Sequence, residues 1–547
     1  MSLHIVLNQL LTVKDAKNHI ITYGYDALGR RVTITDAKNN VFTTVYDANS
    51  NIVKTIDAKG RNTQVKDSLN NSSNASYDTV GNLTSLSGPL GGNTGYAYDR
   101  VSRLISETTT SGGTVTYSYN EKNLKEAVTN ARGQRRQYQY DALGRIIGYV
   151  KGEESVSYTY DANGNILSVT DKNGTITRTY DALNRVTSCT DTFGKTIGYA
   201  YDAVGNLASI VYPDNTTVVY EYDGNNNLVK VTDWSGRVTS YTYDVNNKVI
   251  GIVKPDGSVT TTVYDDKQRI TSTVERTAAG LVITGFEYTY DEIGRILEEI
   301  HVEKGIKMCY TYDNLSRVTA RTIMNLTDNS QTQETYIYDA AGNIVGGSSD
   351  NTFTYDVNNR LGSYNGQAVT YDEDGNMLSA FLGGATSNFV YDSANRLVSA
   401  GGNTYTYNGE DIRICSVCGG NTTTYTYNTN AKLSQLLIKT TGGVVTKYVY
   451  GLGLIGEECQ STFKTYHFDY RGSTVAITDV NGNITDAFQY DTYGRQTART
   501  GTNQIAFGYN GRDGVVTDEN GLIYMRARYY APEIRRFINA DIIAGTI

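Results

Sequence analysis

Two aspartates near the C-terminal end, Asp513 and Asp541, each stand close to an arginine, at Arg512 and Arg536. Two carboxylates that share one site can act as a protease dyad, because one of them keeps its proton. A single carboxylate beside an arginine is instead held ionised and suits a salt bridge. Asp513 and Asp541 are therefore weak catalytic candidates, and we expect this chain to have no enzymatic activity of its own.

Cys415 and Cys418 form a closely spaced cysteine pair. A structural zinc site takes four ligands, yet no second such pair follows, and the histidines lie far away at positions 4, 19, 301 and 467. Five cysteines in 547 residues are too few for a disulfide framework. We expect no metal and no cofactor, and either a local disulfide or two free thiols on a hairpin.

Most of the chain is built from a repeated sequence unit. A tyrosine, in most copies followed by aspartate, returns every 20 or 21 residues from Tyr77 to Tyr264 and more loosely as far as Tyr391. A fixed period of this size is typical of arrays of one supersecondary unit, none of which buries its apolar face alone.

One unit can be read at residues 158–180. Tyr158-Thr-Tyr160 alternates as a strand, Asp161 to Asn165 contains the glycine of a turn, and Ile166 to Thr170 is a second strand. Asp171 to Gly174 is another turn that leads to Tyr180. The sequence therefore predicts antiparallel hairpins throughout.

The repeated residues have structural roles in this interpretation. The aspartate begins a turn, where its carboxylate can accept backbone N–H bonds. Tyrosines in Tyr-x-Tyr-Asp point to one face and are expected to stack in a cross-strand ladder. Arginines in Gly-Arg pairs, as at Arg30 and Arg145, can stack on tyrosine rings.

The number of strands predicts the architecture. Roughly two dozen two-stranded units would unroll to about 230 Å, and open twisted sheets of that width must coil. A ribbon wound about twice has a diameter near 35–40 Å, too wide for side chains to fill. Propellers usually have eight or fewer blades, and the chain has too many units for that architecture. The predicted fold is all-β, a long antiparallel sheet spiralled into a hollow shell.

Composition limits the partners. The net charge of −8 argues against nucleic acid, which attracts basic surfaces. No apolar run is long enough to span a bilayer, and residues 1–12 lack the features of a signal peptide.

The repeats Tyr25-Asp-Ala-Leu-Gly-Arg30 and Tyr140-Asp-Ala-Leu-Gly-Arg145 resemble the YD repeats of the RHS family. The C-terminal part is similar to the RHS repeat-associated core domain in order and spacing, on the motifs Asp469-Tyr-Arg-Gly-Ser473, Gln489-Tyr-Asp-Thr-Tyr-Gly-Arg495, Gly521-Leu-Ile-Tyr-Met-Arg-Ala-Arg-Tyr-Tyr530, Arg536-Phe537 and Asp541.

This resemblance implies a cocoon-like β-shell over residues 1–465 and a core segment over 466–547 that plugs one end, with Tyr529, Tyr530 and Phe537 as buried anchors. In bacterial members a C-terminal toxin domain lies inside the shell and is freed by aspartyl autoproteolysis. The chain departs from the family pattern at Ala531, which replaces an aspartate, and at Arg535, which replaces a glycine. It stops before a cleavage segment or a toxin, so we expect no self-cleavage.

The leading hypothesis is a non-enzymatic container from a secreted or cell-surface bacterial toxin-delivery protein, with a toxin cargo in cis. The alternative is a wall-associated adhesion protein whose exposed tyrosines contact carbohydrate or a cell surface.

Overall fold

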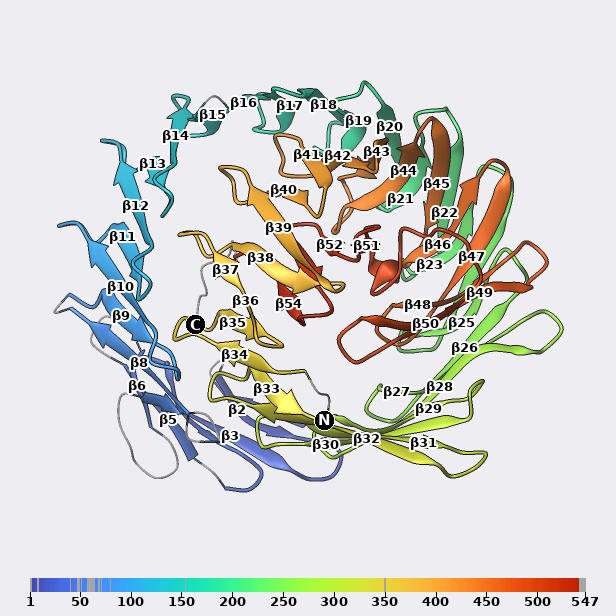
Figure 1. Ribbon diagram of the computed structural model, residues 1–547, viewed down its shortest axis with the longest axis horizontal. Coiled ribbons are helices and arrows are strands. Elements are labelled where there is room, and N and C mark those ends of the chain that lie inside the picture. Colours follow the sequence, from blue (N-terminus) through green and yellow to red (C-terminus); the bar gives the residue numbers. More distant parts are fainter. Residues whose placement is uncertain are drawn as a thin grey trace. The chain divides into compact units, whose positions relative to one another are not determined.

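The computed structural model consists almost entirely of β-strands (Figure 1). It describes residues 2–6, 9–39, 41–46, 50, 52–56, 64–66, 69, 71–78, 80–152, 154–348 and 351–540. The chain forms two compact units, the first made of residues 1–133, 312–319 and 335–366 and the second of residues 134–311, 320–334 and 367–547. In the part of the chain described, no helix is long and apolar enough to cross a membrane.

The strands of the first unit are β1 (Ser2–Val6), β2 (Gln9–Lys14), β3 (Ile20–Tyr25), β4 (Arg31–Thr35), β5 (Val41–Tyr46), β6 (Ile52–Ile56), β7 (Gln64–Lys66), β8 (Ser72–Tyr77), β9 (Leu83–Ser87), β10 (Asn93–Tyr98), β11 (Leu104–Thr109), β12 (Thr114–Tyr119), β13 (Lys125–Thr129), β33 (Ile344–Gly347), β34 (Phe353–Tyr355) and β35 (Leu361–Tyr364). Strands β30 (Ile306–Tyr312), β31 (Val318–Asn325) and β32 (Gln331–Tyr338) include residues of both units.

The second unit begins with a meander in which each strand pairs antiparallel with the next: β14 (Arg135–Tyr140), β15 (Ile146–Lys151), β16 (Glu154–Tyr160), β17 (Ile166–Asp171), β18 (Gly174–Tyr180), β19 (Val186–Thr190), β20 (Thr196–Tyr201), β21 (Leu207–Val211), β22 (Thr217–Tyr222), β23 (Leu228–Thr232), β24 (Val238–Tyr243), β25 (Val249–Val253), β26 (Val259–Tyr264), β27 (Ile270–Arg276), β28 (Val282–Tyr290) and β29 (Ile296–His301). We call β14–β29 the first layer.

A 14-stranded sheet follows, again in chain order, and we call it the second layer: β37 (Thr370–Tyr371), β38 (Met377–Leu382), β39 (Ala385–Tyr391), β40 (Leu397–Ala400), β41 (Asn403–Tyr407), β42 (Arg413–Cys418), β43 (Asn421–Asn428), β44 (Gln435–Thr441), β45 (Val444–Tyr450), β46 (Leu454–Cys459), β47 (Thr462–Phe468), β48 (Thr474–Thr478), β49 (Ile484–Tyr490) and β50 (Gln496–Thr500). The short β36 (Gln367–Ala368) precedes it. After it come the 3-10 turn η1 (Gly511–Asp513) and a small sheet of β51 (Val516–Thr517), β52 (Ile523–Met525), β53 (Arg528–Ala531) and β54 (Arg536–Phe537).

The predicted all-β class and the antiparallel hairpins are confirmed. The unit expected at residues 158–180 is observed as β16, β17 and β18, with turns at the two predicted places. Where the register is described, the pairing commonly shifts by one residue next to the last tyrosine of a repeat strand, as between Thr159 and Tyr160. Such a bulge sharpens the local twist before the turn.

The repeat turn is held by its aspartate. In one copy, Oδ1 of Asp141 accepts hydrogen bonds from the backbone N–H groups of Leu143 at 2.9 Å and Arg145 at 2.9 Å. Oδ2 accepts a bond from Nε of Arg145 at 2.6 Å. The turn also needs a residue in the left-handed region, and this position is Gly144 with φ +80° here but Asn184 with φ +62° in a later copy.

The arginines of the repeats stack on tyrosine rings as predicted, but each ring belongs to the repeat that follows the arginine. The guanidinium of Arg145 lies 4.6 Å from the ring centre of Tyr160, and that of Arg185 lies 4.5 Å from Tyr201. The tyrosine hydroxyl donates to a backbone carbonyl of an earlier strand, as from Tyr201 to Val186 at 2.9 Å. In these units the partner of a ring is the arginine of the preceding turn, and the expected ladder of directly stacked tyrosines is wrong for them.

The turn aspartates predict acid sensitivity. Hydrogen bonds from the backbone and the guanidinium of Arg145 hold the pKa of Asp141 below its usual value, although desolvation opposes them. The same direction holds for Asp181 and Asp265. A lowered native pKa means that the stabilisation is complete above the unfolded pKa of about 3.9 and is lost as the pH falls through the native value. The melting temperature followed by circular dichroism is therefore expected to fall steeply between about pH 4 and pH 2.

A matched variant can check this cause. Asparagine occupies the aspartate position naturally at Asn120, whose Oδ1 accepts backbone bonds from Lys122 and Leu124 at 3.0 Å each. Asp141→Asn should keep the turn and lose its share of the acid-dependent change. An unchanged pH profile in variants with several such replacements would show that other groups control acid unfolding.

The two layers of the second unit pack against each other. Figure 1 shows the orange strands β41–β45 beside the green strands β19–β22. The hydroxyl of Tyr199 donates to Oδ1 of Asn428 at 2.9 Å, and the hydroxyl of Tyr212 donates to the carbonyl of Tyr448 at 2.6 Å. Further along, Nε1 of Trp234 donates to Glu458 at 3.0 Å. The second layer thus follows the first in the same direction, as a wound ribbon laid over itself does.

A polar cluster is buried between the layers. Nζ of Lys254 lies 2.7 Å from Oε1 of Glu275, and Nδ1 of His467 lies 3.0 Å from Oε2 of the same glutamate. Thr478 donates to Oδ2 of Asp256 at 2.6 Å. Although burial would raise it, the pKa of Glu275 is lowered because His467 and Lys254 face it. The cluster joins two first-layer segments to two second-layer strands.

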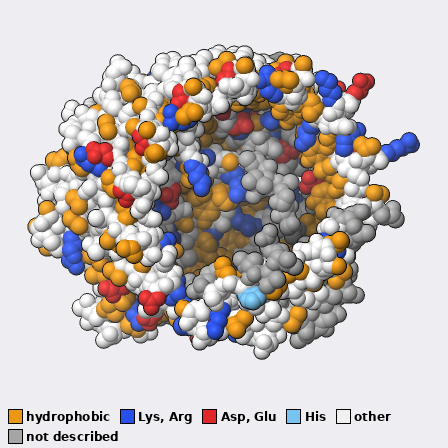
Figure 2. All heavy atoms as spheres, turned by 180° about the vertical axis from the view of Figure 1, so that it is seen from behind, with side chains coloured by type: hydrophobic (Ala, Val, Ile, Leu, Met, Phe, Trp, Pro, Cys, Tyr) orange, Lys and Arg blue, Asp and Glu red, His pale blue; other side chains and the backbone are white. Residues whose placement is uncertain are grey.

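Charged side chains of both signs are scattered over the face of the molecule in Figure 2, among apolar and uncharged polar residues. Among the described residues visible there, neither sign forms an extended surface.

Candidate functional site

The chain leaves the second layer after β50, and residues 501–540, here called the capping segment, fold back over that layer. Its Phe507 is fully buried, with its ring centre 4.9 Å from that of Tyr448. Thr426 of β43 contacts the first layer through Asp191, whereas Tyr425 of the same strand faces Arg413 and the capping segment. Successive side chains of a strand point to opposite faces, so the capping segment lies on the face of the second layer turned away from the first.

The boundary between segments differs from the sequence prediction. Position 465/466 falls inside β47, and β48, β49 and β50 continue the same sheet. The structural change comes after Thr500, where the regular repeat strands end. The motif at residues 466–500 therefore belongs to the sheet, because it still alternates and turns like the other repeats.

Of the three expected anchors, Tyr529 is the most deeply placed. It is 1% exposed, and its ring centre lies 5.1 Å from those of both Tyr405 and Tyr524. Its hydroxyl lies 3.0 Å from Nη1 of Arg413 and 3.3 Å from the hydroxyl of Tyr407. Tyr529 thus joins the capping segment to two second-layer strands.

The other two anchors lie further out. Tyr530 is half-buried and donates to the carbonyl of Tyr493 at 2.9 Å. The expectation that Phe537 is buried is wrong, since it is 36% exposed. Phe537 belongs to β54, the last strand of the small sheet in the described structure, where its ring lies 5.5 Å from that of Tyr530 and 3.8 Å from the guanidinium of Arg528.

Arg413 is the residue that the sequence analysis missed. Its side chain is completely buried, and Nη1 pairs with Oδ2 of Asp518 at 2.6 Å. Its guanidinium lies within 6 Å of four tyrosine rings, those of Tyr405, Tyr425, Tyr524 and Tyr529. No motif marks it, because Arg413 comes one position later in its repeat than the usual turn arginine.

Of the two catalytic candidates, the described structure contains only Asp513. Asp513 ends the turn η1 and pairs with the adjacent Arg512 at 3.1 Å, with 43% of its side chain exposed. Asp541 lies outside the described residues. Arg536 lies in β54.

Cys415 and Cys418 lie in the same strand, β42, and both are free thiols. Sγ of Cys418 lies 3.1 Å from Oε2 of Glu519, which raises the pKa of this thiol. Within the described ranges, no group of three or more histidine, cysteine or acidic side chains is placed to bind a metal ion.

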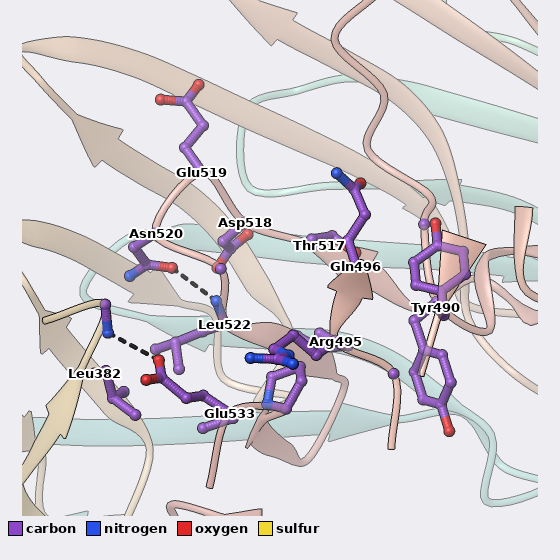
Figure 3. A pocket seen from close by; sticks show the side chains of 18 of the residues that line it. Leu382, Tyr490, Arg495, Gln496, Thr517, Asp518, Glu519, Asn520, Leu522 and Glu533 are labelled. Atoms are coloured by element: carbon purple, nitrogen blue, oxygen red, sulfur yellow. Dashed lines mark hydrogen bonds between the residues drawn. The ribbon is translucent and has the colours of Figure 1, made fainter. Parts of the chain in front are cut away.

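A cavity of about 530 Å³ lies at the capping segment (Figure 3). One side is formed by Tyr490 of β49 and by Arg495, Gln496 and Arg499 at β50. The others are formed by the turn between β38 and β39, the loop around residues 517–523 and residues 531–533. Its walls therefore come from the beginning and the end of the second layer and from the capping segment.

Comparison with known proteins agrees with this architecture. The family model described as teneurin YD-shell matches residues 4–136, 124–277, 194–322 and 256–546. Salivary gland surface protein 1 of Aedes aegypti is 35% identical over 101 residues, which are 18% of this chain and 3% of that protein. The tRNA(Glu)-specific nuclease WapA of Bacillus subtilis subsp. natto is 29% identical over 108 residues, 19% of this chain and 4% of that protein.

Solved structures show the same fold at low identity. TcdB2-TccC3 without the hypervariable C-terminal region has a TM-score of 0.78 at 16% identity and covers 99% of this chain and 34% of its own. The Tc holotoxin pore of Photorhabdus luminescens has a TM-score of 0.77 at 17% identity, and the match covers 97% of this chain and 32% of that chain. The chain thus spans about a third of the length of these solved chains and a few per cent of the curated relatives.

The family model extends from residue 4 to residue 546. This chain belongs to the teneurin YD-shell family, the YD-repeat shells to which its RHS-like motifs are related.

Proposed function

We propose that this chain is the shell wall of a secreted or cell-surface toxin-delivery protein and that it encloses a polypeptide cargo, a C-terminal toxin domain. The observation that carries the proposal is the capping segment, which covers the face of the second layer that is turned away from the first layer. The unit then has a wall of two strand layers with an additional segment anchored on it by Tyr529 and Arg413. Such a wall suits containment better than turnover of a small substrate.

The repeat residues support a structural role for the chain itself. The carboxylates of the turns are occupied by backbone N–H groups and arginines, as at Asp141. We therefore propose that the chain has no enzymatic activity and that any activity belongs to the cargo. Three relatives carry the name tRNA nuclease, and the matched stretches make up only about 4% of each of them. The net charge of −8 and the mixed surface of Figure 2 support a partner other than nucleic acid.

The alternative is adhesion to carbohydrate through exposed tyrosines, and repeat tyrosines that stack under an arginine do not favour it. The ring of Tyr201, for example, packs against the guanidinium of Arg185, and its hydroxyl donates a hydrogen bond to a backbone carbonyl. A tyrosine engaged in this way offers neither an open ring face nor a free hydroxyl to a sugar.

Protection of a fused reporter tests the container. A small, protease-sensitive reporter domain is attached after Ile547 of the complete chain, and proteinase K digestion is followed by mass spectrometry. The fused reporter should survive a protease concentration that removes the same reporter added in trans. Arg413→Met, which weakens the anchoring of the capping segment, should shorten this protection. Equal digestion of fused and free reporter would contradict containment.

A further inference from the structure

A second cavity lies between the two layers of the second unit, and its volume is about 320 Å³. One wall is formed by β20, β21, β22 and β23 of the first layer, in the green part of Figure 1. The other wall is formed by the turn after β43 and by the adjoining ends of β44 and β45, in orange. The cavity therefore exists only because the second layer returns over the first.

The walls of this interlayer cavity are uncharged. None of the described residues that line it is an arginine, a lysine, an aspartate or a glutamate. The larger cavity at the capping segment, in contrast, is lined by charged side chains of both signs, namely Arg495, Arg499, Asp518, Glu519 and Glu533. A charged ligand that entered the interlayer cavity would lose water without meeting an opposite charge, which is unfavourable. The cavity thus favours a neutral ligand.

Three neutral polar groups of the wall keep unused hydrogen-bonding capacity. Tyr220 is 9% exposed, and its hydroxyl has no hydrogen-bond partner in the described structure although it stays accessible to solvent. Oε1 of Gln435 accepts a bond from Nδ2 of Asn428 at 3.0 Å, which leaves the side-chain N–H groups of Gln435 unused. Nδ2 of Asn430 donates to the hydroxyl of Tyr201 at 2.9 Å, which leaves the side-chain oxygen of Asn430 unused. Polar groups at the depth of Tyr220 are normally satisfied, so its hydroxyl requires a partner from inside the cavity.

The unused groups define the chemistry of the ligand. A tyrosine hydroxyl both donates and accepts, a carboxamide N–H donates, and a carboxamide oxygen accepts. Burial raises the pKa of Tyr220, so its hydroxyl stays protonated and uncharged. The apolar side chains of Leu207, Ile210 and Leu228 also line the cavity.

A sugar ring matches this combination of groups. Each of its hydroxyls can donate and accept a hydrogen bond, and its C–H groups can contact apolar side chains. A volume of about 320 Å³ is at the lower end of the usual range of small-ligand sites. The cavity therefore suits a ligand of one or two sugar rings.

We propose that the interlayer cavity is a binding site for a neutral sugar of one or two rings, held by the hydroxyl of Tyr220 and the carboxamides of Gln435 and Asn430. This site differs from the exposed repeat tyrosines considered above, because the hydroxyl of Tyr201 is engaged whereas that of Tyr220 is not. The bound sugar would join the layers, since Tyr220 belongs to the first and Gln435 to the second. The site does not depend on the proposed container role, because it requires only that the second layer covers the first.

The test uses the complete chain and four neutral disaccharides as probes: maltose, cellobiose, lactose and chitobiose. Isothermal titration calorimetry should show saturable binding of at least one of them to a single site. That sugar should also raise the melting temperature, because it binds only the folded chain. Its derivative with a carboxylate at C6 should bind more weakly by about tenfold or more, because the wall offers no cation to the charge.

Matched variants locate the site. Tyr220→Phe should weaken binding of that sugar by about three- to tenfold, the value of one hydrogen bond. It should keep the wild-type melting temperature, because the hydroxyl has no partner in the protein. Gln435→Glu keeps the oxygen that accepts from Asn428 but removes the N–H donor, so it should also weaken binding. Tyr427→Phe removes an unpartnered hydroxyl that lies outside the cavity, so it should leave binding unchanged.

Three outcomes overturn the proposal. In the first, none of the four disaccharides binds the wild-type chain. In the second, a disaccharide binds, but Tyr220→Phe binds it as tightly as the wild type does. In the third, the C6 carboxylate derivative binds as tightly as the neutral sugar, which would place the sugar outside the uncharged cavity.

Discussion

Replacing Arg413 by methionine is expected to lower the free energy of unfolding by about 3–5 kcal/mol, because it leaves the buried carboxylate of Asp518 without its counter-charge. The side chains of Arg413 and Asp518 are 0% and 8% exposed, and their ion pair measures 2.6 Å. The loss also removes a cation from the rings of Tyr425 and Tyr524, at 4.9 and 4.2 Å. Urea unfolding followed by circular dichroism measures the difference.

Two further variants separate the contributions. The double variant Arg413→Met with Asp518→Leu should recover much of the lost stability, because a buried ion pair can often be replaced by apolar side chains at little cost. Arg495→Met serves as a control, since Arg495 is 58% exposed and its contact with Asp491 is 3.5 Å long; it should change stability by less than about 1 kcal/mol. An Arg413→Met variant as stable as the wild type would mean that Asp518 is not confined as the structure shows.

The second large effect is expected at Tyr529. Tyr529→Ala should destabilise the chain by about 3–5 kcal/mol, the usual range for a large buried aromatic side chain. It empties a site between Tyr405 and Tyr524 and removes the hydroxyl bonds to Arg413 and Tyr407. Thermal and urea unfolding of the complete chain provide the measurement.

Phe537 is the matched control for Tyr529. It lies in the same small sheet but is 36% exposed, so Phe537→Ala should cost no more than about 1 kcal/mol. Equal losses for the two variants would contradict the different depths at which the structure places these rings. Tyr529→Phe should cost about 1 kcal/mol, because it removes only the hydroxyl.

The local structure could be predicted from the sequence because the repeat encodes it locally. Asp141, Gly144 and Arg145 lie within one turn and satisfy each other there. The same turn chemistry predicted β17 and β18 to within one residue, whereas β16 ends as predicted but begins four residues earlier. The stacking of Arg145 on Tyr160 was harder to predict, because it depends on which strand carries the ring that the guanidinium contacts.

The site was harder to predict because its partners are distant in sequence. Arg413 meets Asp518 and Tyr529 across more than one hundred residues, and His467 meets Glu275 across the two layers. Periodicity cannot show which of many similar strands will face each other. The exposure of Phe537 depends on β54 being an edge strand, which also cannot be seen in the residue pattern.

The layered sheet has a consequence for the order in which the protein folds. Hairpin contacts join residues within about one repeat. The hydrogen bond of Tyr212 requires Tyr448, 236 residues later, and that of Asp256 requires Thr478, 222 residues later. Local pairing is fast and long loops close slowly. A chain emerging from a ribosome or a secretion channel therefore displays the bare apolar side of its early strands until the later ones arrive. During that interval it is most exposed to aggregation, and a chaperone acting on it has to recognise that transient surface.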